Sequence, residues 1–265
     1  MYRAPLGETD FSLFLTGRTG TFKTALAALC QQHFGAAMDA RRLPGHFAST
    51  ANALEELAFQ AKDALLVIDD FAPTGRVGDD ALEAVAERLF RAAGNGQGRS
   101  RMRGPQLRAP RPPRALLLAT GEEVPRGHSV RARLLIMELR PGDVDLAALS
   151  RCQIAGQEGR LAEAMGAYLA WIARDYENRQ EHLRRRSREL RGGANGGASA
   201  VHARLPGILA ELQSGGRLGC NLHLRSERSI VQSRPSWSKE AGKRCRKSQR
   251  FSLPITKPAI RRFAF

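Results

Sequence analysis

A short apolar segment runs directly into a glycine-bearing loop and then into a helical pattern. The apolar run is Phe11-Ser-Leu-Phe-Leu15, the loop is Thr16-Gly-Arg-Thr-Gly-Thr-Phe-Lys-Thr24, and the helical pattern spans Ala25 to His33. Strand, glycine loop, Lys-Thr and helix in this order are typical of a phosphate-binding loop. In such a loop, backbone N–H groups and the helix N-terminus face anionic phosphates. The segment therefore predicts an α/β nucleotide-binding fold.

The loop supplies the residues that we assign to a nucleotide. Lys23 would reach the β- and γ-phosphates of ATP, and Thr24 would place its hydroxyl on Mg²⁺. Against the pattern G-x-x-x-x-G-K-[ST], Gly17 aligns with the first glycine, but Phe22 stands where the second is expected. A side chain at position 22 must point away from the nucleotide while its N–H group stays in the cradle, which is possible only if its backbone angles suit a non-glycine residue. The predicted nucleotide contacts are Gly17, Arg18, Thr19, Gly20, Thr21, Phe22, Lys23 and Thr24.

A second apolar run ends in two acids. Ala64-Leu-Leu-Val-Ile68 is typical of a buried strand, and Asp69 and Asp70 follow it directly. This is the form of a Walker B segment, in which one carboxylate holds the Mg²⁺ shell and the next orients or deprotonates the attacking water. We assign Asp69 to the metal and Asp70 to the water. The alternative is that the two acids cap a buried strand and bind nothing.

Two further apolar runs predict other strands of the same sheet. Ala115-Leu-Leu-Leu-Ala119 precedes Thr120, and a run over 134–139 follows a basic stretch. Ligands of an open parallel sheet lie at the carboxyl ends of its strands, so Thr120 is predicted to sense the γ-phosphate. Arg131 and Arg133 are candidates for an arginine finger that neutralises charge on the transferred phosphoryl group, often from a neighbouring subunit. Either could instead be a surface cation that caps the strand.

Taken together, these segments resemble the ATP-binding part of bacterial and mobile-element proteins that contain the domain of unknown function 927. The resemblance is carried by GRTGTFKT, LLVIDDFAPTG, GRSRMRG and PPRALLLATGEEVPRGHSVRARLL, and it spans residues 11–176. That family resembles superfamily 3 helicases within the ring-forming ATPases. The resemblance implies a site for ATP and Mg²⁺, a homo-oligomeric ring, and an arginine finger among Arg126, Arg131 and Arg133.

An arginine-rich loop precedes the predicted sensor strand. Superfamily 3 helicases place a DNA-gripping hairpin at this point, and here the loop carries Arg99, Arg101 and Arg103. Alternate residues of a strand share a face, so the three guanidinium groups would face a phosphate track of single-stranded DNA. The loop has no aromatic residues to stack bases, so the contact would be electrostatic and independent of sequence. The alternative is a solvated basic loop.

The positive charge is concentrated near the C-terminus. The formal net charge is +16, of which residues 176–265 contribute +14 and residues 1–175 contribute +2. The run GGANGGASA over 192–200 is typical of a flexible linker. Beyond one weakly helical piece over 203–213, the segment is rich in Ser, Arg and Lys, and we expect it to be disordered. It could be a basic arm that grips phosphates, or a frameshifted, non-native end.

The expected fold class is α/β: a P-loop NTPase with a mainly parallel sheet flanked by helices. Residues 1–145 would form the ATPase core, 146–191 a small helical lid, and 192–265 the flexible linker and disordered basic tail. No run approaches the roughly 18 apolar residues of a membrane span, so we expect no membrane partner and a cytoplasmic location. The four cysteines are scattered without metal-ligand spacing.

Three functions remain open on the sequence. The first is a helicase-like ATPase that acts on DNA in mobile-element replication. The second is a nucleotide-binding module without turnover, which is suggested by Phe22 and by Asp70, a shorter acid than the usual glutamate. The third is a truncated remnant whose basic tail binds nucleic acid without specificity.

Overall fold

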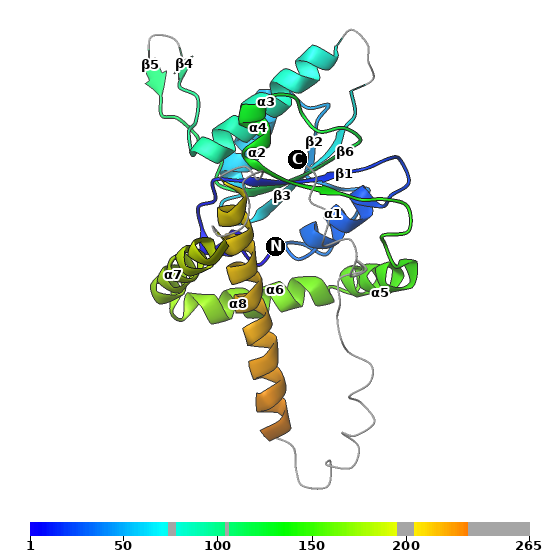
Figure 1. Cartoon of the computed structure of the whole chain (residues 1–265), viewed down its shortest axis with the longest axis vertical. Coiled ribbons are helices and arrows are strands. Elements are labelled where there is room, and N and C mark those ends of the chain that lie inside the picture. The colour runs from blue at the N-terminus through cyan, green and yellow to red at the C-terminus, as the bar shows by residue number, and fades with distance from the viewer. Residues whose placement is uncertain (74–77, 104–105, 195–203, 233–265) are drawn as a thin grey trace.

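A five-stranded parallel sheet forms the centre of the molecule (Figure 1). The computed structural model describes residues 1–73, 78–103, 106–194 and 204–232. The strands occur in the order β2-β3-β6-β1-β7 across the sheet, so that β6 lies between β1 and β3. Their bounds are Ser12–Thr16 (β1), Gly45–His46 (β2), Leu65–Phe71 (β3), Leu116–Gly121 (β6) and Leu134–Glu138 (β7). The expected α/β fold with a mainly parallel sheet flanked by helices is confirmed.

Helices cover both faces of this sheet (Figure 1). Helix α1 packs on one face, with α5 and α6 beyond it, while α2, α3 and the short α4 lie on the other. The bounds are Lys23–Gln31 (α1), Ala51–Gln60 (α2), Asp79–Asn95 (α3), His128–Arg131 (α4), Leu146–Gln157 (α5) and Arg160–Ala173 (α6). A strand covered on both faces must be apolar throughout, which explains the continuous apolar runs in the sequence.

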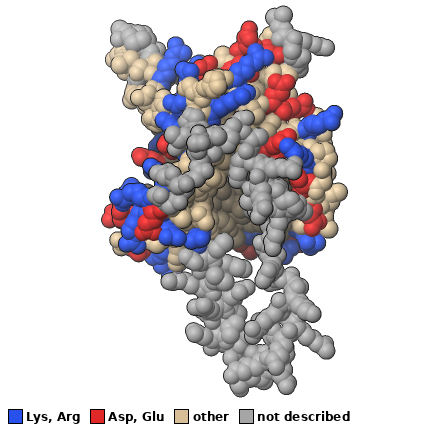
Figure 2. All heavy atoms as spheres, in the orientation of Figure 1, with Lys and Arg blue, Asp and Glu red and all other residues tan. Residues whose placement is uncertain are grey.

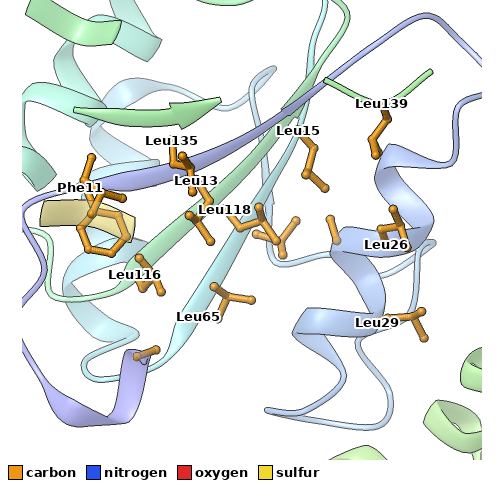
Figure 3. Packing of buried hydrophobic residues seen from close by; sticks show 14 of the residues in the cluster. Phe11, Leu13, Leu15, Leu26, Leu29, Leu65, Leu116, Leu118, Leu135 and Leu139 are labelled. Atoms are coloured by element: carbon orange, nitrogen blue, oxygen red, sulfur yellow. The ribbon is translucent and has the colours of Figure 1, made fainter. Parts of the chain in front are cut away.

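The two faces of β1 belong to two separate cores. Leu13 and Leu15 point toward α1, where they pack with Leu26 and Leu118 (Figure 3). Phe14 points to the opposite face and meets the rings of Phe71 and Phe90 edge-on. Because successive residues of a strand alternate between faces, this short strand fixes the sheet between both helical layers. The segment that follows β1 is therefore held from both sides.

A two-stranded antiparallel hairpin projects from the body (Figure 1). Its strands are β4 (Arg101–Arg103) and β5 (Gln106–Arg108), with Arg101 opposite Arg108. The hairpin follows α3 and precedes β6, which is where the arginine-rich loop was expected to form one.

The C-terminal helices differ from the expected linker and tail. Helix α7 spans Tyr176–Ala194, and α8 spans Leu205–Gln232 and packs along α7. The expectation of disorder from residue 215 is wrong for the described part of the segment. Ile208 belongs to the core beside α1, and Arg3 forms an ion pair of 2.9 Å with Glu211. Basic composition concealed the apolar positions of α8, which are its buried face. The rest of the predicted tail, from 233, lies outside the described residues.

None of the helices in the described ranges combines the length and the apolar character that crossing a bilayer requires.

Candidate functional site at the carboxyl edge of the sheet

Three predicted site segments meet at the carboxyl edge of the parallel sheet. Leu15 of β1 lies opposite Thr120 of β6, and Ile68 of β3 lies opposite Ala119. The glycine loop that follows β1 is thereby brought beside Thr120 and the two acids of β3. Open parallel sheets bind their ligands at this edge, so the topology predicts a ligand site here.

The glycine loop closes around the ammonium group of Lys23. Lys23 Nζ donates to the carbonyl oxygens of Gly17 at 2.6 Å and Arg18 at 3.0 Å. Thr21, which is buried, donates its hydroxyl to the same Arg18 oxygen at 2.8 Å. The first N–H groups of α1, at residues 23–25, have no acceptor within the helix and face the loop. The lysine and the helix terminus together give the glycine loop a positive potential.

Gly17 is required by a close approach of backbone. A Cβ at this position would lie 2.3 Å from the carbonyl oxygen of Leu139 and 2.9 Å from Thr21 Oγ1. The residue also has φ of +153°. A side chain here would therefore push the loop away from the segment that follows β7.

The backbone of Phe22 is not in a conformation that suits a non-glycine residue. Its φ of 65° and ψ of 21° fall in the left-handed region, which costs an L-residue about 1–2 kcal/mol. The condition stated for this position is therefore not met, and Phe22 adopts the left-handed geometry of the glycine that the pattern places there. The phenyl ring is 43% exposed.

Asp69 joins the glycine loop to β6. Thr24 Oγ1 donates to Asp69 Oδ1 at 2.9 Å, and the hydroxyl of Thr120 donates to the same oxygen. Thr120 is buried. One carboxylate oxygen thus accepts two hydroxyl hydrogen bonds from two different elements, which fixes its position at the sheet edge.

Asp70 sits on a β-bulge. The register of β3 against β6 shifts between Ile68 and Phe71, and Asp70 has φ of 68°. Its backbone N–H donates to Thr120 Oγ1 at 3.2 Å, while its carboxylate is exposed. The bulge re-aims the side chain, as bulges beside active sites commonly do. Asp69, Thr120 and Asp70 therefore form one hydrogen-bonded unit.

His46 is a site residue that the sequence did not reveal. Its Nε2 lies 3.6 Å from Asp70 Oδ2, and its Nδ1 accepts from the backbone N–H of Ala48 at 3.0 Å. An Nδ1 that accepts a hydrogen bond leaves the proton of the neutral ring on Nε2, which faces the carboxylate. The two-residue strand β2 has no periodic pattern, and only the topology places it beside β3.

Glu122 is a second residue that we missed. Its carboxylate accepts from the hydroxyl of Thr19, and its carbonyl oxygen accepts from Thr16 Oγ1 at 3.1 Å. Both contacts tie the turn after β6 to the glycine loop. Next to them lies a cavity of about 290 Å³, whose lining includes Arg18, Val124, Arg131 and Pro141.

The three candidate arginine fingers lie in different places, and Arg126 pairs with Glu83 of α3 at 3.6 Å. Arg131 lines the cavity beside the glycine loop and donates from Nε to the carbonyl oxygen of Pro125 at 3.0 Å. Arg133 precedes β7, and its carbonyl accepts from Ser12 at the start of β1, so it lies at the opposite edge of the sheet. Its guanidinium donates to Asn95 Oδ1 at 2.7 Å. Partial burial, with Arg204 and Arg91 nearby, lowers the pKa of Arg133. Strands of this length span about 16 Å, so Arg133 cannot reach its own glycine loop.

The described part of the chain contains no group of three or more His, Cys, Asp or Glu side chains that could hold a metal on its own. Mg²⁺ does not need such a group, because it commonly binds through one or two carboxylates together with substrate phosphates and water. The hydroxyl oxygen of Thr24 and the carboxylate of Asp69 are oxygen ligands of the kind that Mg²⁺ prefers.

The sequence matches no protein-family model and no curated protein. Among solved structures, it is similar to one described as "SCCmec type IV Cch - active helicase", with a TM-score of 0.50 and 14% sequence identity. The match covers 84% of this chain and 42% of that chain, so this chain spans less than half of the helicase's length. At this identity the similarity shows a shared fold.

Proposed function

We propose that this chain is an ATP-binding, helicase-like ATPase that acts on DNA in the replication of a mobile element. The observation that carries the proposal is the hydrogen bond from Thr24 to Asp69, which joins the residue after the loop lysine to the acid after β3. The fold shared with a helicase supports it. The same residues carry the resemblance to proteins with the domain of unknown function 927.

The triphosphate would lie against the glycine loop. On binding, Lys23 would exchange two neutral carbonyl acceptors for anionic phosphate oxygens, which form stronger, charge-assisted hydrogen bonds. The N–H groups of residues 18–24 would supply the rest of the cradle. Gly17 keeps this cradle seated against Leu139.

Thr24 and Asp69 would hold Mg²⁺. When bound, the ion supplies charge neutralisation between the β- and γ-phosphates. The hydroxyl of Thr120 fixes Asp69 from the other side. Asp69 therefore enters the reaction already oriented, without a rearrangement of its side chain.

Asp70 would position the attacking water. The water oxygen bonds to the γ-phosphorus, the bond from that phosphorus to the β–γ bridging oxygen breaks, and the water proton passes to Asp70 or to the phosphate product. Thr120 holds the backbone of Asp70, and His46 faces its carboxylate.

Single-stranded DNA would contact the hairpin β4–β5, through Arg99, Arg101 and Arg103. Arg101 and Arg103 lie in β4 and Arg99 precedes it. In a homo-oligomeric ring such hairpins would line a channel. Arg133, at the edge opposite the glycine loop, is then the finger candidate for a neighbouring subunit, and Arg131 the candidate within the subunit.

A nucleotide-binding module without turnover is the second candidate function. The observation that favours it is the left-handed backbone at both Phe22 and Asp70, the two positions where the sequence departs from the motif. In this case the loop still binds ATP, but the water is not held in line for attack.

The test is ATP hydrolysis by the full chain, with and without single-stranded DNA. We expect turnover that rises with DNA and is abolished in Lys23→Ala. Lys62→Ala is the matched control, since Lys62 is an exposed lysine that pairs only with the neighbouring Asp63 among the described residues. ATP binding without hydrolysis would replace the first candidate by the second, and equal loss in Lys62→Ala would contradict both.

A further inference from the structure

Helices α7 and α8 enclose a basic cleft on the side of the molecule formed by the C-terminal helices. The cleft has a volume of about 410 Å³ and is lined by His182, Arg185, Arg186 and Glu189 of α7 and by Ser214, Arg217 and Leu218 of α8. The α7 residues are spaced i, i+3, i+4 and i+7, and the α8 residues i, i+3 and i+4. Each set therefore forms one stripe on its helix, and the two stripes face each other across the cleft.

The cleft has more positive than negative charge. Three arginines face one carboxylate, that of Glu189. Glu189 accepts from Arg186 at 2.8 Å and lies 3.9 Å from Arg185. Within the described ranges, no carboxylate lies within ion-pair distance of Arg217. Guanidinium groups held this close repel one another, and an anion between them would relieve that repulsion.

The walls of the cleft are anchored to the core. On α8, the Arg3–Glu211 ion pair lies one turn before Ser214, and the buried Ser214 donates to Ala210 at 2.7 Å. On α7, the buried Leu183 packs beside Tyr168 and Leu218. The arginines therefore project from rigid helices and not from a loop, which reduces the entropy lost on binding.

We infer that the α7–α8 cleft is a second nucleic-acid contact, which binds the phosphate groups of a single-stranded backbone. Arg185 and Arg217 would each offer a planar fork of donors to phosphate oxygens. The α7 stripe from His182 to Glu189 covers eight residues, and the seven steps between them rise by about 10 Å along the helix. This length exceeds one phosphate group, so the cleft favours a polymer over a single phosphate ion.

Further arginines extend the basic surface along α7 beyond the cleft. Arg184 and Arg188 are exposed and share one acid, Glu181, at 3.8 Å and 3.1 Å. Figure 2 shows blue side chains with interspersed red ones where α7 lies in Figure 1. A single-stranded nucleic acid that leaves the cleft could continue along α7. We expect little dependence on base sequence, because the described lining contains no Phe, Tyr or Trp ring for stacking and His182 is its one imidazole.

The test measures the affinity of the full chain for a fluorescein-labelled oligothymidylate at several salt concentrations. We compare Arg185→Gln/Arg217→Gln with the control Arg151→Gln/Arg174→Gln, which removes the same charge from exposed sites on α5 and at the end of α6. The cleft variant is expected to bind about tenfold more weakly and to lower the salt slope by about 1.4, or 0.7 for each lost phosphate contact. The control variant is expected to keep the wild-type slope.

Equal affinity and slope in the two double variants would overturn the inference. A second variant, Arg185→Lys/Arg217→Lys, keeps the charge and loses the planar fork, so an affinity between those of the wild type and the Gln variant supports direct phosphate contact. Displacement of the oligonucleotide by inorganic phosphate at the same phosphate concentration would overturn the polymer assignment. These readouts do not require ATP turnover, so they stand apart from the test of the proposed function.

Discussion

The carboxyl edge of the sheet and the α7–α8 pair are both rich in polar groups, but they are organised differently. At the sheet edge, each polar group has a specific partner: Thr24 and Thr120 share Asp69, and Lys23 is held by two carbonyls. On α7, four arginines from 184 to 188 share two carboxylates, and the spacing of the helix alone arranges them. Specific pairing suits a site that positions reacting atoms, whereas loosely shared charge suits a surface that binds a polyanion.

Asp69→Asn should have the largest effect, because it removes the charge at the centre of the sheet-edge network. We expect kcat for ATP hydrolysis to fall at least about 100-fold. The control is Asp80→Asn, on the exposed first turn of α3. If both variants keep the wild-type kcat, the specific pairing of polar groups at the sheet edge does not contribute to ATP hydrolysis.

Ile208→Ala tests whether α8 belongs to the core or is a tail. Ile208 is buried beside α1, so its truncation should lower the free energy of unfolding by about 2–4 kcal/mol. The matched control is Ile154→Ala on α5, where the side chain is 51% exposed and the cost should stay below about 1 kcal/mol. Chemical denaturation measures the free energy of unfolding of both variants. Equal losses would contradict the placement of Ile208 in the core.

His33 makes the free energy of unfolding depend on pH, because its imidazole ring is buried. Burial lowers the pKa of His33 to about 4, from an ordinary value of 6.5. As pH falls from 6.5 to 4, the unfolded chain takes up a proton that the folded chain does not, so folding is progressively destabilised. The total loss is about 3 kcal/mol. Denaturation at several pH values should show this loss in the wild type and not in His33→Gln.

Phe22→Gly should have the smallest effect and the opposite sign. Glycine relieves the left-handed strain at this position and costs some entropy, which leaves a net gain of about 0.5–1 kcal/mol in the free energy of unfolding. Phe22→Ala keeps the strain and should show no gain. An equal gain in Phe22→Ala would show that the gain does not come from relief of left-handed backbone strain at position 22.

The sequence predicted the central sheet well because the signal is local. Four apolar runs correspond to β1, β3, β6 and β7, and the polar residues that end them meet at one edge, as parallel topology requires. The cap of α2 is local in the same way, since the hydroxyl of Thr50 accepts from the N–H of Ala53 at 3.3 Å. In each case the deciding interactions lie within a few residues, or follow from strand order.

The parts that the sequence did not predict depend on distant contacts. His46 reaches Asp70 only because β2 pairs with β3, and Glu122 reaches Thr19 across 103 residues of chain. The part of α8 after the weakly helical piece over 203–213 was hidden by glycines and basic residues that usually mark disorder, although Leu218 is buried by elements near the N-terminus. Composition describes a segment in isolation, whereas burial depends on its neighbours in the fold.

Binding of a fluorescent ATP analogue, in the presence of Mg²⁺, tests the central claim most directly. The full-length wild type should bind saturably, Lys23→Ala should bind at least about tenfold more weakly, and Lys62→Ala should match the wild type. This measurement needs no turnover, no DNA and no oligomer. Equal affinity of Lys23→Ala and the wild type would contradict the assignment of the glycine loop as the nucleotide site.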